Sequence, residues 1–396
     1  MMATRNIAGV LMLAATLSSM SVPAGADCPL IPIPNAWWSP PHEGNAPKAP
    51  TQIKDMTREH FENSQNEGAS YCLYSPPPSE PAHGLIMFLH GGQPSEVGAN
   101  DPMLQFLAKA GFYIVYPYIP RAREDGPYAP SRARAALSDA LSKLKVERNV
   151  DIQRVAVVGQ SYGGAVAVRV AATWTQSPAI RAIVLHDPWW DPVPICSWLA
   201  TDRDRCAQEW DYITQPYTNI ACSTRLLMMQ AERGTGEHVN RFWKNLQHIA
   251  RYVGAPGSTT PQRNFLQVPH DVSQRLALGI VLESTLLTPT VLAPDTCRSW
   301  NFWMGNWVDD DYGCHLTSMD EYGYWRPTRA AVYEAFYGQP ISPDYSPYCN
   351  SASKAGSCAT TRDMGRWLMD NKEATPMKNA ADLNLLQDIQ VDHCTP

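Results

Sequence analysis

Short runs of apolar residues recur along this chain of 396 residues, and they limit the folds that are open to it. Runs of five or six apolar residues, without alternation of polar and apolar positions, are typical of strands that are buried on both faces. Turn signals or helical patterns separate one run from the next. The runs lie at residues 84–89, 112–116, 154–158, 180–185 and 225–229, and a shorter apolar stretch at 264–268 is the expected last strand.

Helical patterns lie between these runs. Apolar residues follow helical spacing from Leu137 to Leu144, with Ser131 as the expected N-cap, and again from Val239 to Ala250. Strands that alternate with helices form a mostly parallel sheet with helices on both faces. We therefore expect an α/β domain over residues 71–290, and 44% hydrophobic residues are enough for its core.

The N-terminal residues have the pattern of a secretion signal. Arg5 supplies the positive charge, residues 7–17 an apolar stretch, and Ala24-Gly25-Ala26 a cleavage site, so residues 1–26 are the expected signal peptide. This predicts a secreted protein, extracellular or periplasmic. The following residues 27–70 are rich in proline, which indicates an irregular arm.

Ten cysteines follow the expected cleavage site, and an even number in an exported chain predicts disulfides. Five of them precede residue 291 and five follow it, so complete pairing requires at least one bond across that point. The segment 291–396 also contains five tryptophans. We expect it to be a disulfide-rich C-terminal extension packed on the core.

Charge and composition exclude several classes of protein. The net charge is −6 and no basic run is present, so a nucleic-acid-binding function is not expected. The apolar residues 7–17 are too few for a membrane span. Asp309–Asp311 has no spaced ligand set around it, so we expect a solvated turn there, and neither a metal nor a cofactor.

The strongest chemical signal is Gly159-Gln160-Ser161-Tyr162-Gly163-Gly164. It follows the run 154–158 directly and precedes the helical stretch 165–172, which is the strand–turn–helix setting of a G-x-S-x-G nucleophile elbow. Small residues on both sides of the serine let the chain turn sharply and project the hydroxyl above the sheet. Ser161 is therefore the candidate nucleophile.

A second signal, His90-Gly91-Gly92, closes the run 84–89. Acyl transfer needs two backbone N–H groups that face the developing oxyanion. One is expected from Tyr162, which follows the nucleophile, and the other from the glycine loop. Gly92 is favoured for the second donor, with Gly91 as the close alternative and a candidate substrate contact.

The nucleophile needs a histidine as its base and an acid to orient that histidine. His270 follows the last apolar run and is the preferred base, with His186 as second choice. Asp187 follows the run 180–185 and is the preferred acid. Glu232 and Glu237, which come after the next run, are the alternatives.

These motifs resemble the α/β-hydrolase superfamily, and within it the plasma-type platelet-activating-factor acetylhydrolase and chlorophyllase-like esterases. The resemblance rests on residues 89–92, 159–164, 185–188 and 269–271 and covers roughly residues 80–285. It implies a Ser161–His270–Asp187 triad. The C-terminal segment, the proline-rich arm and the cysteines depart from the pattern.

The expected function is hydrolysis of carboxylic esters through an acyl-enzyme, with a small-molecule ester of a lipid-like or aromatic acyl group as substrate and no cofactor. Trp189 and Trp190 begin an aromatic insertion that would either line an apolar acyl pocket or pack as a satellite core. Two alternatives remain: a peptidase or amidase on the same fold, and an inactive hydrolase-like binding protein.

Overall fold

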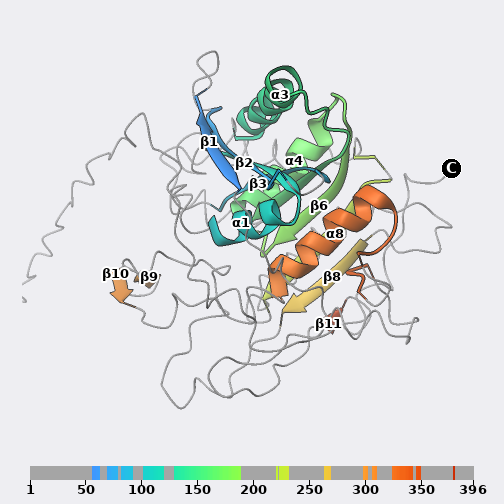
Figure 1. Cartoon of the computed structure of the whole chain (residues 1–396). Coiled ribbons are helices and arrows are strands. Elements are labelled where there is room, and N and C mark those ends of the chain that lie inside the picture. Colours follow the sequence, from blue (N-terminus) through green and yellow to red (C-terminus); the bar gives the residue numbers. More distant parts are fainter. Residues whose placement is uncertain are drawn as a thin grey trace, which may run out of the picture.

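A computed structural model describes the parts of the chain that form the sheet and the helices around it (Figure 1). The described residues are 56–62, 69–78, 82–91, 101–119, 129–188, 220–221, 223–231, 263–268, 298–301, 306–309, 323–341, 345–348 and 378–379.

Nine strands form one sheet in the order β1-β2-β4-β3-β5-β6-β7-β8-β11. The six strands from β4 to β8 in that order are parallel, and antiparallel pairing joins β2 to β4, β1 to β2 and β11 to β8. The predicted mostly parallel sheet is confirmed. The strands are β1 Thr57–Phe61, β2 Tyr71–Ser75, β3 Gly84–Leu89, β4 Phe112–Pro117, β5 Val155–Gln160, β6 Ile180–His186, β7 Arg225–Ala231, β8 Arg263–Val268 and β11 Lys378–Asn379.

Helices cover both faces of the sheet, as the alternation of elements predicts (Figure 1). On β5, Val155 and Val157 face the core that includes α3 and α4, whereas Ala156 and Val158 face the core that includes α1 and α8. None of the described helices is long and apolar enough to cross a bilayer. The helices are α1 Asp101–Lys109, α3 Ala129–Arg148, α4 Tyr162–Thr173 and α8 Arg326–Tyr337.

The N-terminal parts of two elements differ from expectation. Helix α3 begins at Ala129, so Ser131 lies inside it and its assignment as N-cap is wrong. Pro130 is accommodated because the first turn of a helix does not need the N–H that proline lacks. Strand β1 lies in the segment 27–70, so the arm is not irregular throughout; its polar sequence suits a partly exposed edge strand.

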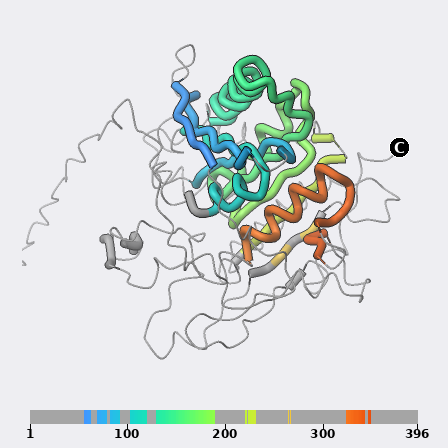
Figure 2. Tube along the Cα trace, in the orientation of Figure 1, coloured from blue at the N-terminus to red at the C-terminus, as the bar shows by residue number. Residues whose placement is uncertain are grey.

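The C-terminal part of the chain contributes to the core of the domain. Helix α8 packs against β6 and β7, far from it in sequence (Figure 2). Strand β11 extends the sheet by pairing with β8. A separate two-stranded sheet pairs β9 Arg298–Asn301 with β10 Asn306–Asp309. Cys72 is the one cysteine among the described residues, and it is disulfide-bonded. The disulfide-rich extension therefore stays a prediction.

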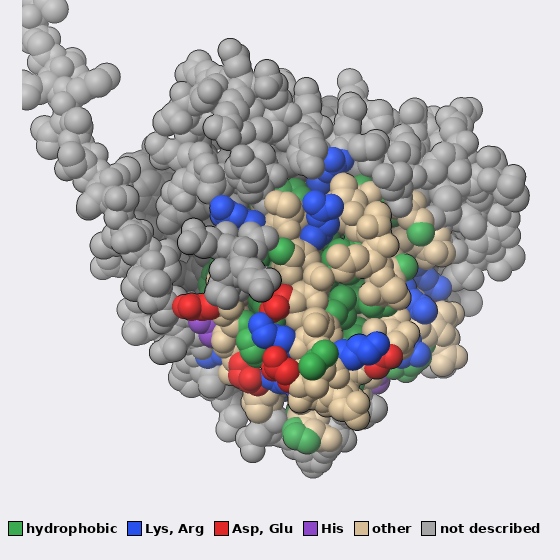
Figure 3. All heavy atoms as spheres, turned by 90° about the horizontal axis from the view of Figure 1, so that it is seen from above, with side chains coloured by type: hydrophobic (Ala, Val, Ile, Leu, Met, Phe, Trp, Pro, Cys, Tyr) green, Lys and Arg blue, Asp and Glu red, His purple; other side chains and the backbone are tan. Residues whose placement is uncertain are grey.

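Acidic and basic side chains are interspersed on the face of the molecule seen in Figure 3. On helix α3, Lys143 pairs with Asp139 at 2.6 Å, and Arg148 pairs with Glu59 of β1 at 2.6 Å. Each of these two basic residues of the helix thus has an acidic partner. The pattern agrees with the absence of a basic run from the sequence.

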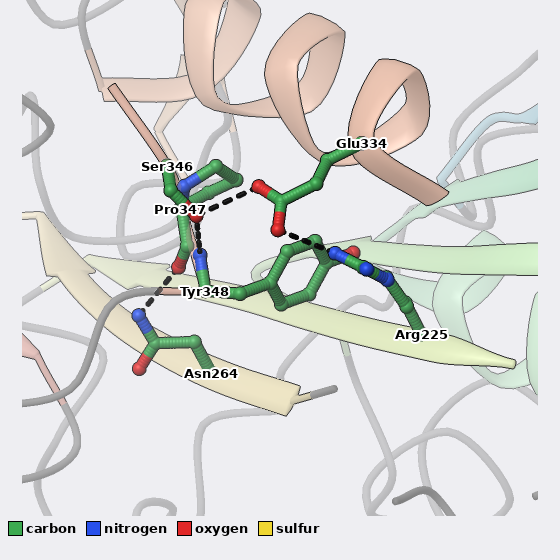
Figure 4. A network of polar contacts seen from close by, with 6 residues as sticks. All are labelled: Arg225, Asn264, Glu334, Ser346, Pro347 and Tyr348. Atoms are coloured by element: carbon green, nitrogen blue, oxygen red, sulfur yellow. Dashed lines mark hydrogen bonds and ion pairs between the residues drawn. The ribbon is translucent and has the colours of Figure 1, made fainter. Parts of the chain in front are cut away.

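A polar network fixes the C-terminal segment to the sheet (Figure 4). The carboxylate of Glu334 on α8 accepts hydrogen bonds from Arg225 on β7 and from Ser346. The side-chain amide of Asn264 on β8 donates to the carbonyl of Pro347. Because Glu334 is 2% exposed, loss of Arg225 would leave a buried carboxylate without its cation.

Candidate active site

Ser161 occupies the sharp turn between β5 and α4. Its backbone has φ 49° and ψ −122°, a conformation that costs free energy in any residue other than glycine. Two backbone hydrogen bonds hold the turn: Ser161 N–H donates to the carbonyl of His186 at 2.9 Å, and Gly164 N–H donates to that of Ser161 at 2.9 Å. The strand–turn–helix setting and the strained serine are those of a nucleophile elbow.

The glycines around Ser161 are required by close backbone approach. A Cβ at Gly163 would overlap the carbonyl oxygens of Leu89 and His90, and one at Gly159 would overlap the carbonyl of Gly163. A Cβ at Gly164 would collide with the side chain of Pro188. The elbow can therefore pack against β3 and the end of β6 only with glycine at these positions.

Gly91 lies beside the nucleophile. A Cβ built on Gly91 would be 3.4 Å from Cβ of Ser161 and 3.9 Å from its Oγ. A side chain at this position would therefore lie against the hydroxyl of Ser161. Tyr162 is the first residue of α4, where backbone N–H groups point out of the helix, and its side chain is buried. Gly92 lies outside the described residues.

The side chain of His90 is hydrogen-bonded to the backbone of the glycine loop. Its Nδ1–H donates to the carbonyl of Gly91 at 2.7 Å, and its ring stacks on Tyr116 at 5.6 Å between centroids. Burial lowers the pKa of His90 to about 4, although its hydrogen bonds to backbone carbonyls favour the protonated form. The imidazole is therefore neutral at pH 7 and acts as a fixed donor to the loop.

Asp187 follows β6 directly and lies at the same edge of the sheet as Ser161. The last residues of the two strands, Gln160 and His186, are register partners. Asp187 has φ 40°, its N–H donates to the carbonyl of Met229 at 2.8 Å, and its Oδ2 accepts a hydrogen bond from the hydroxyl of Tyr324 at 2.6 Å. Two strained, non-glycine residues, Ser161 and Asp187, thus occupy the ends of adjacent strands.

His186 does not have the surroundings of a general base. It is 2% exposed, and its Nε2 bonds to Oγ1 of Thr328 at 2.8 Å. Because the Thr328 hydroxyl donates to the carbonyl of Tyr324 at 2.7 Å, the proton between His186 and Thr328 belongs to His186. Burial lowers its pKa to about 3. The second-choice base is thus a neutral core residue.

Acidification is expected to destabilise the fold through these two histidines. When folded they have pKa values of about 3 and about 4, below the value of 6.5 for an ordinary histidine. Below about pH 6.5 these histidines bind protons in the unfolded chain but not in the folded chain. The free energy of unfolding therefore decreases as the pH falls. Urea unfolding at several pH values should show a loss of about 1.4 kcal/mol per pH unit for each histidine.

A His186→Gln variant separates this effect from other titrations. The slope of the unfolding free energy against pH should decrease by about 1.4 kcal/mol per unit between about pH 6 and about pH 4. An unchanged slope in the variant would mean that His186 titrates normally in the folded protein.

Several predicted site residues lie outside the described residues: His270, Trp189, Trp190, Glu232 and Glu237. The strands that precede them are described. Val268, the last residue of β8, is the register partner of Ala231 at the end of β7. Because β7 extends to Ala231, Glu232 follows its strand as directly as Asp187 follows β6. Strand β8 is parallel to β5 and β6, so its carboxyl end lies at the edge that carries Ser161.

Two residues near the site were not found from the sequence: Tyr324 and Thr328. Thr328 lies on α8, and Tyr324 lies in the turn that leads into it. This helix has a sequence signal, because Pro327 stands near its start and Gly338, with φ 74°, directly after its end. The contact between Tyr324 and Asp187 had none, since it joins residues 137 positions apart.

Comparison with known proteins agrees with this architecture. A family model described as alpha/beta hydrolase fold matches residues 86–248. Together with the sheet order and the elbow, this identifies an α/β-hydrolase fold. No curated protein matches the sequence significantly.

The solved structures that match this chain include esterases of low sequence identity. Esterase B from Lactobacillus rhamnosis, with a tributyrin phosphonate, is 14% identical, with a TM-score of 0.41 over 57% of this chain and 78% of that one. A fungal esterase from Rhizomucor miehei is 17% identical, with a TM-score of 0.40 over 56% and 78%. The esterase domain of a Rhodothermus marinus protein is 16% identical, with a TM-score of 0.36 over 56% and 91%. Since these TM-scores are below 0.5, conclusions about activity rest on the site residues.

Proposed function

We propose that this protein is a serine hydrolase that cleaves carboxylic esters through an acyl-enzyme. One observation carries the proposal: Ser161 is held in a strained elbow at the carboxyl edge of a parallel sheet, with Gly91 beside it and Asp187 at the end of the neighbouring strand. A serine in an ordinary βα turn has no need of that conformation. Strain of this kind persists where function requires the side chain to be exposed.

In the proposed reaction Oγ of Ser161 attacks the ester carbonyl carbon while His270 takes the hydroxyl proton. The N–H groups of Tyr162 and Gly92 stabilise the oxyanion, with the loop held by His90. The C–O bond to the alcohol then breaks, and His270 gives its proton to the leaving oxygen. Water, deprotonated by His270, attacks the acyl carbonyl carbon. The bond from that carbon to Oγ of Ser161 then breaks, His270 returns the proton to Oγ, and the carboxylic acid is released.

The proposed enzyme has three further features. Asp187 orients His270, Trp189 and Trp190 contact the acyl group, and the protein is exported with disulfides that include a bond to the C-terminal segment. The motif resemblance to platelet-activating-factor acetylhydrolase and chlorophyllase-like esterases supports a lipid-like or aromatic acyl ester as the substrate.

Turnover of p-nitrophenyl esters tests the proposed chemistry directly. Acyl chains of increasing length should be hydrolysed with a defined optimum, and the matching p-nitroanilides should be poor substrates because an amine is the worse leaving group. Efficient cleavage of the anilides would instead indicate an amidase. Absence of turnover with every acyl chain would favour a binding protein.

A further inference from the structure

The hydroxyl of Tyr324 donates a hydrogen bond to Oδ2 of Asp187 at 2.6 Å. Tyr324 is 1% exposed, and it belongs to the C-terminal segment that packs on β6. A buried phenol needs a partner for its O–H, and a carboxylate is a stronger acceptor than a neutral oxygen. This contact thus joins the C-terminal segment to the candidate acid of the active site.

Tyr324 is itself fixed by the strand that carries Asp187. It lies in the π-helical turn 323–325 that leads into α8. Its carbonyl accepts the hydroxyl of Thr328, and Oγ1 of Thr328 accepts Nε2–H of His186. Its ring also meets the ring of His186 edge-on, at 5.4 Å between centroids. Two consecutive residues, His186 and Asp187, are therefore held from one turn of the C-terminal segment.

This arrangement restricts the rotation of the Asp187 carboxylate. A carboxylate accepts hydrogen bonds at both oxygens. The bond at Oδ2 limits the orientations that the carboxylate can take, and in the proposed triad its other oxygen, Oδ1, accepts the Nδ1–H of the imidazole. A triad acid acts by holding the base in one tautomer and orientation, and a rotating carboxylate would do so poorly.

We propose that Tyr324 is a positioning residue of the catalytic machinery, acting through Asp187 and holding its carboxylate in the orientation that His270 requires. The inference rests on the proposed function, in which Asp187 orients the base. It gives the C-terminal segment a part in the reaction, because the donor comes from outside the strands and loops that carry the triad.

Replacing Tyr324 by phenylalanine removes the donor and keeps the ring. We expect kcat for a p-nitrophenyl ester to fall about tenfold, since hydrogen bonds to charged groups are among the stronger ones in proteins. KM should change less than about twofold, because Tyr324 acts on Asp187 and not on the substrate. An unchanged kcat would overturn the inference.

Tyr348→Phe is the matched control. Tyr348 belongs to the same C-terminal segment and is also 1% exposed, but its hydroxyl is buried without a hydrogen-bond partner among the described residues. Its ring lies beside the guanidinium of Arg225, and phenylalanine preserves that contact (Figure 4). Arg225 pairs with Ala182 near the start of β6, at the other end of the strand from Asp187. This variant should keep kcat and KM. A tenfold loss here as well would show that the effect at Tyr324 is only structural.

A double-mutant cycle with Asp187→Asn separates positioning from general stability. If Tyr324 acts through Asp187, adding Tyr324→Phe to Asp187→Asn should cost less than about twofold further in kcat. A further tenfold loss would mean an independent structural role and overturn the inference.

The single variants separate this inference from the proposed function. Activity retained by Ser161→Ala would overturn the proposed function. Loss of activity with Ser161→Ala and with Asp187→Asn, but not with Tyr324→Phe, would overturn this inference alone.

Discussion

Replacement of Ser161 by alanine is expected to lower kcat by at least about 10⁴-fold, because the remaining oxyanion donors and binding contacts supply only a small part of the rate. The fold should persist, since alanine is smaller than serine and the two backbone hydrogen bonds of the turn do not involve the side chain. A fluorophosphonate should label the parent enzyme on the peptide that contains Ser161. It should not label the variant.

Ser138→Ala is the matched control for this loss. Ser138 lies on helix α3, where its hydroxyl donates to the side chain of Gln176 in an exposed position. The variant should be as active and as readily labelled as the parent. Labelling at a serine other than Ser161, or full activity of Ser161→Ala, would exclude the assignment of the nucleophile.

The strands of this fold could be predicted because their signal is local. Apolar residues on both faces mark a buried strand, and the runs at 84–89, 112–116 and 180–185 coincide with β3, β4 and β6 to within one residue. The apolar run ends before the strand does where a polar residue lies near the end of the strand. Strand β5 continues to Gln160, and β7 continues through Gln230 to Ala231. A run of apolar side chains stops there, but backbone hydrogen bonding does not.

The site could be predicted only where its geometry is built by neighbouring residues. The elbow is determined by the glycines around Ser161, which the sequence displays as a single motif. The hydrogen bond to the carboxylate of Asp187 differs, because its donor, Tyr324, lies 137 positions away in the sequence and no local motif contains both residues. Hydrophobic periodicity gives the position of a helix along the chain. It does not specify which strand that helix covers, and so Tyr324 could not be placed beside the acid.

Replacing Asp187 by asparagine is expected to lower kcat by about 10³–10⁴-fold, as in other triads in which the acid becomes an amide. An amide can present its NH₂ to the imidazole and so favour the wrong tautomer of His270. The shape of the side chain is preserved, and the backbone bond from Asp187 N–H to Met229 is unaffected. Steady-state kinetics with a p-nitrophenyl ester, alongside thermal unfolding, measures the loss of activity in a folded protein.

Glu232→Gln and Glu237→Gln are the comparison variants for Asp187→Asn, because they remove the two alternative candidates for the triad acid. Both residues follow β7, the next strand in the sheet, and Glu232 is as close to its strand end as Asp187 is to β6. Distance from the strand end does not separate the two candidates. What favours Asp187 is its backbone, strained at φ 40°, and the hydrogen bond from the buried hydroxyl of Tyr324, two features that hold a carboxylate in one place.

The glutamate variants should therefore lose less than about tenfold in kcat, by comparison with the loss expected for the triad acid. If Glu232→Gln is the inactive variant and Asp187→Asn is nearly normal, the acid lies after β7, and Tyr324 stabilises the end of β6 instead of the active site.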